Sequence, residues 1–158
     1  FDLTEYSGKM ASRYGAEQPP ESWVEVSNDH LFRTATRCSV EEMPAFLAKG
    51  FGISSDGSEG FARSVGADLV ARRSGSWRHA LAIIGCDLRG REPLFLIQNS
   101  WGNYLKYEAG RTIPGTSYQI PRGSFFARAS DIKQRRNITF SGANGWQRNS
   151  IDLTPGFD

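Results

Sequence analysis

Two short apolar runs flank a polar stretch near the middle of the chain. Residues 79–85 and 94–99 are rich in aliphatic side chains, and residues 86–93 between them are polar and contain a glycine. Apolar runs separated in this way are typical of an antiparallel hairpin. If the turn centres on Arg89, residue 84 pairs with 94, 82 with 96 and 79 with 99. This register predicts that His79 and Asn99 lie opposite each other on one face of the sheet.

The remaining pattern predicts strands with helices outside them. Residues 39–49 carry apolar side chains on one helical face, and Ser39 and Glu42 have the spacing of a capping box. The alternation indicates an α+β fold class. Residues 1–140 are expected to form one domain, in which 1–38 are a helical lead-in, and 141–158 a loop-rich tail. Within the domain we expect strands at 31–37, 51–55, 124–128 and 137–140, a short helix at 131–136, a loop or irregular hairpin at 56–76, and a long surface loop at 103–119.

Composition excludes several classes of function. The net charge of +2 over 158 residues is too small to indicate a nucleic-acid or acidic-membrane partner. No apolar stretch is long enough to span a membrane, and this chain carries no targeting signal. Two histidines without a Cys/His cluster make a transition-metal site unexpected, and no other cofactor is indicated. The basic run 133–136 is expected to be a solvated helix end.

The predicted pairing of His79 with Asn99 has a chemical meaning. A carboxamide that accepts a hydrogen bond from an imidazole fixes the tautomer and the orientation of the ring. This pair is the orienting half of a nucleophile–base–orienter triad. Taken singly, each residue has a structural alternative: His79 as a core histidine, Asn99 as a turn residue and Trp101 as a core aromatic.

The two blocks Trp77-Arg-His-Ala-Leu-Ala-Ile-Ile-Gly85 and Leu96-Ile-Gln-Asn-Ser-Trp-Gly102 resemble the papain-like cysteine peptidases of the C1 family. The resemblance implies the C-terminal, antiparallel β-barrel-like lobe of that fold. His79 would then be the catalytic histidine and Asn99 its orienting partner. Trp101 would shield their hydrogen bond from water, and Trp77 would lie beside the cleft.

The nucleophile implied by the resemblance has no clear place in this chain. In such enzymes a cysteine about 130–150 residues before the histidine and asparagine attacks the peptide bond, so it would lie upstream of Phe1, in an N-terminal lobe. Cys38, near the start of a predicted helix, and Cys86 are interpreted as structural thiols. We therefore expect this chain alone to be inactive, and to contact either the upstream lobe or another subunit. A peptide would be the substrate of the joined enzyme.

The alternative is an inactive papain-like structural or interaction protein in a larger assembly, such as a phage virion component. The location would accordingly be a virion or the cytoplasm.

Overall fold

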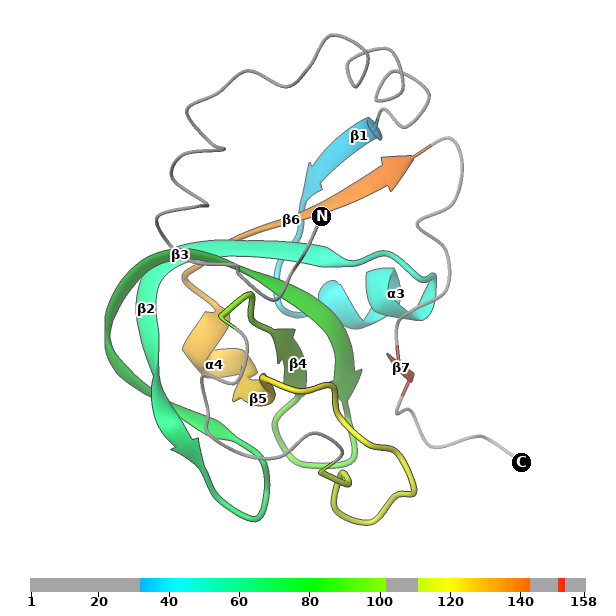
Figure 1. Cartoon of the computed structure of the whole chain (residues 1–158). Helices are drawn as coiled ribbons and strands as arrows, with labels where there is room; N and C mark the ends of the chain where they lie inside the picture. The colour runs from blue at the N-terminus through cyan, green and yellow to red at the C-terminus, as the bar shows by residue number, and fades with distance from the viewer. Residues whose placement is uncertain (1–31, 102–110, 143–150, 153–158) are drawn as a thin grey trace, which may run out of the picture. The chain divides into compact units, whose positions relative to one another are not determined.

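A mostly antiparallel sheet dominates the part of the chain that the structure describes. The computed structural model describes residues 32–101, 111–142 and 151–152 (Figure 1), which belong to one of the two units into which the chain divides. The strands are β1 (Phe32–Arg37), β2 (Ile53–Val65), β3 (Ala71–Asp87), β4 (Leu94–Gln98), β5 (Ser124–Arg128), β6 (Arg136–Gly142) and β7 (Ile151–Asp152), and the helices are α3 (Met43–Ala48) and α4 (Ala129–Ile132).

The strand order supports the predicted combination of antiparallel sheet and short helices. Neighbouring strands follow the order β1-β6-β2-β3-β4-β5, and β7 pairs in parallel with the end of β3. The order ends at β1 on one side and at β5 on the other, so the described sheet is not closed into a barrel. Residues 1–31 of the expected lead-in, 102–110 of the expected loop, and 143–150 and 153–158 of the expected tail lie outside the described residues.

The strands β2 and β3 form a long hairpin, which in Figure 1 curves across much of the described part. Pairing runs from Ile53 opposite Ile83 to Val65 opposite Ala71, and the register shifts three times on the way. Each shift interrupts the two-residue alternation of side chains that makes a strand recognisable in a sequence. The predicted short strand at 51–55 is therefore wrong in length, and the segment 56–76 is an irregular hairpin.

The hairpin of β3 and β4 forms where it was predicted, but in another register. Ala82 pairs with Gln98 and, after a one-residue shift, Gly85 pairs with Leu96. The prediction that residue 82 faces residue 96 is therefore wrong by two positions. Nearer the turn, where Asp87 pairs with Leu94, the predicted register is wrong by three positions. At Ala82 and beyond, the displacement of two leaves side chains on their predicted face, because side chains alternate with a period of two.

Two apolar clusters bury β4 from both sides. Phe95 belongs to a larger cluster that includes side chains of α3, while its neighbour Leu96 belongs to a second, smaller cluster. Ile113, from the described part of the expected surface loop, and Ile120, directly after that loop, belong to the second cluster and are almost fully buried. A strand covered on both faces has no polar alternation, which explains the continuous apolar run at 94–97.

The tip of the long hairpin makes contact with the outer edge of β5. The backbone nitrogen of Phe126 donates a hydrogen bond to the carbonyl oxygen of Leu69 at 2.9 Å, and Val70 forms an isolated parallel bridge with Phe126. Leu69 has a positive φ of 61°, which is uncommon for a residue other than glycine. The edge of β5 is therefore partly covered by the turn between β2 and β3.

The helices differ from the prediction mainly at their ends. α3 begins at Met43 rather than at Ser39, and residues 40–42 form a turn that leads into it. The capping-box contact is nevertheless present, since the Glu42 carboxylate accepts a hydrogen bond from the Ser39 backbone nitrogen at 2.8 Å. α4 lies at residues 129–132, two residues before the predicted start, and β6 extends the predicted last strand in both directions.

Candidate functional site

His79 and Asn99 meet as the hairpin pattern predicted. The Nε2 atom of the His79 ring lies 3.0 Å from the Oδ1 atom of Asn99, which is a direct hydrogen bond. His79 is half-buried in β3, and Asn99 is the first residue after β4 and is only 3% exposed. The two side chains therefore meet, His79 from within β3 and Asn99 from the end of the neighbouring strand β4.

The observed register explains how Trp101 joins this pair. Extended from the pairing of Ala82 with Gln98, it places Trp101 opposite His79, whereas the predicted register placed Asn99 there. The His79 and Trp101 rings are stacked, with centroids 4.4 Å apart and an interplanar angle of 25°. The hydrogen bond to Asn99 is accordingly diagonal across the two strands, within reach of side chains of this length.

An aromatic series continues from this stack into the core. Trp77 contacts Trp101 in a tilted arrangement, with ring centroids 5.0 Å apart, and Phe61 packs edge-on against Trp77 at 5.8 Å. Phe61 in turn contacts Phe125, which is fully buried. Trp101 itself is 42% exposed, so it forms the boundary between the His79 ring and solvent. Packing of this kind restricts the imidazole from one side and limits access of water to its bond with Asn99.

The hydrogen bond assigns different tasks to the two ring nitrogens. An amide oxygen can only accept, so Nε2 is the nitrogen that carries the proton donated to Asn99. In the neutral ring, Nδ1 then has a lone pair and can exchange a proton with a nucleophile or a leaving group. The amide nitrogen of Asn99 is buried and has no hydrogen-bond partner among the residues that the structure describes. Asn99 therefore uses its amide oxygen to orient the imidazole ring, while the hydrogen-bonding capacity of its amide nitrogen is not used by any described residue.

Neither cysteine is arranged as the nucleophile for this histidine. Cys86 is seven residues from His79 along β3, a distance of roughly 23 Å in an extended strand. Cys38 is buried in the larger core cluster, and burial, with a smaller contribution from Glu42, raises the pKa of its thiol. A raised pKa is the opposite of what an attacking thiolate requires. The two thiols, which form no disulfide, are structural in this arrangement.

A buried arginine beside His79 was missed by the sequence analysis. Arg135 belongs to the basic run that was expected to be solvated, yet its side chain is fully buried. The guanidinium donates a hydrogen bond from Nη2 to the backbone oxygen of His79 at 2.7 Å. Its neighbour Arg136 is exposed, as predicted for the run. No local pattern separates the two arginines, because the partners of Arg135 come from residues 55–79, far away in sequence.

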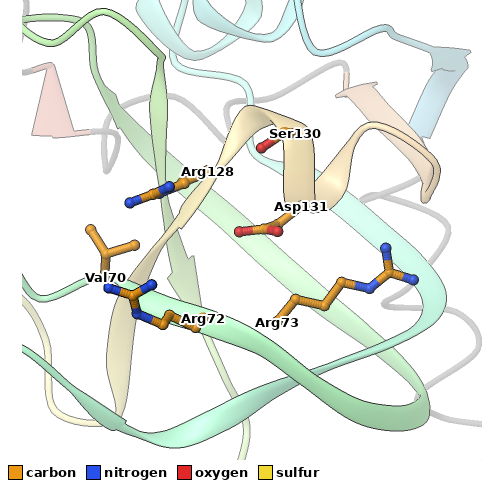
Figure 2. Close-up of a pocket in the computed structure, with 6 residues that line it drawn as sticks. All are labelled: Val70, Arg72, Arg73, Arg128, Ser130 and Asp131. Atoms are coloured by element: carbon orange, nitrogen blue, oxygen red, sulfur yellow. The ribbon is translucent and has the colours of Figure 1, made fainter.

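The described pocket with a volume of about 300 Å³ lies elsewhere and does not include the His79 pair. Figure 2 shows its lining, in which β3 and the β5–α4 junction supply exposed side chains, among them three arginines. One of these, Arg73, lies 3.7 Å from the carboxylate of Glu59. The lining residues are Val70, Arg72, Arg73, Arg128, Ser130 and Asp131.

Two further searches concern metal ions and membranes. Among the described residues, no three His, Cys, Asp or Glu side chains gather closely enough to hold a metal ion. In the same part of the chain, neither helix has the length and apolar character needed to cross a membrane.

Comparison with known proteins adds no family to this picture. The chain has no significant match among protein-family models, among curated proteins or among solved structures. Its interpretation therefore depends on the local geometry of the candidate site.

Proposed function

We propose that this chain supplies the histidine and asparagine of a papain-like cysteine peptidase site. The observation that carries the proposal is the bond between Nε2 of His79 and Oδ1 of Asn99, at 3.0 Å, with the Trp101 ring stacked on the imidazole. A bond to Nε2 leaves Nδ1 to face a thiol, which is the arrangement that a cysteine–histidine–asparagine triad requires. The reaction is hydrolysis of a peptide bond by acyl transfer.

The mechanism divides the chemistry between the chain and an incoming thiol. A cysteine thiolate, paired with the protonated ring of His79, attacks the carbonyl carbon of the peptide. His79 then gives its Nδ1 proton to the leaving amine, the carbon–nitrogen bond breaks, and a thioester remains. Water next attacks the thioester while Nδ1 takes its proton, which releases the carboxylic acid. Asn99 keeps the ring in one orientation through both steps, and no cofactor is needed.

The fold proposed for this function is the C-terminal lobe of a papain-like enzyme. Two features support this fold. The first is the antiparallel order β2-β3-β4-β5. The second is the contact of Leu69, in the turn between β2 and β3, with β5 at the other end of that order. Such curvature is typical of a small barrel-like sheet. The site then lies at one end of the β3–β4 hairpin, where a second lobe would complete the cleft.

The nucleophile is proposed to come from a Cys-bearing lobe upstream of this chain. Cys38 is buried with a raised pKa, and Cys86 is far along β3 from His79. The chain alone is therefore expected not to hydrolyse peptides, and a thiol-directed epoxide is expected not to label either cysteine in the folded protein.

The test begins with the reading frame that precedes the codon for Phe1. A glutamine followed by a cysteine and an aromatic residue at the start of a helix is expected there. The longer polypeptide should then hydrolyse a fluorogenic peptide and react with the epoxide at that cysteine. His79→Ala should abolish both properties, and Asn99→Ala should slow turnover. Arg136→Gln, on an exposed position of β6, is the matched control and should leave the rate unchanged.

Two results would reject the peptidase. The first is an upstream frame without such a cysteine, and the second is a longer polypeptide whose labelling does not depend on His79. Either result would favour the alternative, an inactive structural or interaction protein of a larger assembly such as a phage virion.

A further inference from the structure

Arg135 ties the backbone of His79 to strand β2. Its Nη2 atom donates to the backbone oxygens of His79 at 2.7 Å and of Ser55 at 3.0 Å. The Nη1 atom donates to the backbone oxygen of Glu59 at 2.8 Å, and Nε donates to the Ser55 hydroxyl at 3.0 Å. All of its donor nitrogens are therefore used. Three of the four acceptors are backbone carbonyl oxygens, and a side chain surrounded by water would not be expected to contact them.

These contacts coincide with an irregularity in the sheet. His79 pairs with Gly57, but the next pair is Glu59 with Ser76, so the register shifts between them. A bulge of this kind disrupts the hydrogen-bond ladder and re-aims neighbouring side chains. The planar, branched guanidinium can donate in several directions at once. It therefore provides donors to backbone oxygens on both strands at the position where the regular ladder is interrupted.

The residue opposite His79 must be glycine for this arrangement to exist. A Cβ atom at Gly57 would lie 2.9 Å from Cγ of Arg135 and 2.7 Å from Oε2 of Glu59, closer than such atoms approach in proteins. The Arg135 side chain thus occupies the space that a side chain at position 57 would need. Gly57, the bulge and the buried guanidinium form one unit directly across from the candidate catalytic histidine.

The charge of Arg135 is compensated inside the protein. Oε2 of Glu59 lies 3.5 Å from Nη1, and the Glu59 side chain is only 11% exposed. Burial lowers the pKa of the Arg135 guanidinium, while Glu59 and Asp56 oppose this change. A lysine could restore the positive charge but not the contacts, since its three donors share a single nitrogen. Charge and geometry can therefore be separated by substitution.

We propose that Arg135 is a positioning residue for His79. By holding the backbone oxygen of His79 against β2, it fixes the strand segment from which the imidazole projects, so that the ring faces Asn99 and stacks on Trp101. The catalytic role of this orientation depends on the proposed function, but the orientation of the His79 ring can be measured without any peptidase activity. Failure of one proposal is therefore distinguishable from failure of the other.

The experiment is nitrogen NMR of the His79 ring in the full chain. The substitution His30→Gln leaves His79 as the only histidine, because the sequence contains two. In the neutral ring, the parent chain should show one tautomer with the proton on Nε2. Arg135→Lys should lose this single-tautomer signature and show exchange between both tautomers. The double variant Arg135→Met with Glu59→Gln, which removes both charges together, should do the same.

Arg136→Gln is the matched control, because that arginine is adjacent in sequence, exposed and paired with Asp56. It should retain the parent signature. Gly57→Ala is a further variant that keeps every charge, because its Cβ atom would displace the Glu59 carboxylate and the Arg135 side chain without removing either group. It should also lose the signature. A folded Arg135 variant that keeps the single tautomer would overturn the proposal. If all three perturbing variants fail to fold, Arg135 is a stability residue and the positioning role is rejected.

Discussion

Replacing Asn99 by alanine is expected to change the stability of the protein very little, although the residue is only 3% exposed. The substitution removes one hydrogen bond to His79, which contributes about 0.5–1.5 kcal/mol net. It also removes a buried amide nitrogen that has no partner in the described part of the chain, and such a group costs about 1–3 kcal/mol. After a small cavity penalty, we expect the free energy of unfolding to change by no more than about 1 kcal/mol in either direction.

Asn137 is a matched control with nearly the same burial, 4% exposed. Its amide nitrogen donates to the backbone oxygen of Arg135 at 3.0 Å and more weakly to that of Ile132 at 3.4 Å. Alanine at position 137 leaves buried carbonyl groups without the hydrogen bond from the Asn137 amide. In Asn99→Ala, by contrast, the half-buried His79 ring can form a hydrogen bond with water in place of the lost one. Asn137 also carries an unpaired oxygen, so the difference comes from the partners left behind. We expect Asn137→Ala to be less stable than Asn99→Ala by about 2 kcal/mol.

Urea denaturation of the parent chain and both variants measures this difference, provided that the three slopes agree. Equal destabilisation by the two substitutions would refute the reasoning, because it would mean that the Asn99 amide contributes to stability as a satisfied buried group does. The expected result would instead indicate that Asn99 is retained for the orientation of His79 at some expense of stability, as is common at functional sites.

Three further outcomes follow from the structure. Hydrogen bonds from the Arg89 guanidinium and backbone lower the pKa of Asp87. The stability that this pair contributes is therefore present at neutral pH and declines as the pH falls below about 5. Asp87→Asn should remove that part of the pH dependence of urea unfolding. Cys38 should react with iodoacetamide much more slowly in the folded protein than in urea, because burial raises the pKa of its thiol. Phe125→Ala should lower the free energy of unfolding by about 3–5 kcal/mol in the same titration.

The candidate site was predictable because its residues lie on two strands joined by one short turn. A hairpin needs only local pairing, so the positions of His79, Asn99 and Trp101 relative to one another follow closely from the apolar pattern. The predicted register was wrong by three residues next to the turn and by two beyond the shift between Ile83 and Gly85, because the sequence reveals neither the centre of the turn nor the shift. The hydrogen bond survived this error, because a displacement of two positions keeps side chains on the same face.

The long β2–β3 hairpin was less predictable for a related reason. Its three register shifts scatter polar, small and glycine residues through residues 56–76, so the alternation that defines a strand is absent there. Segment 103–119 was expected on the surface because of its proline and glycines, yet Ile113, in its described part, lies in the second core cluster together with Ile120, which follows the segment. In both segments the apolar residues are too few to show a period, and tertiary packing decides which of them are buried.

The sequence by itself determined the β3–β4 hairpin and the contact of His79 with Asn99, because these depend on interactions between residues close along the chain. It also indicated a sheet with short helices. Only the tertiary structure decided that Arg135 is buried while Arg136 is exposed. The burial of Arg135 depends on Ser55, Glu59 and the backbone of His79, which are 56 to 80 residues away in the sequence. A buried guanidinium is stable only where such partners are already assembled around it, and their assembly depends on the complete sheet.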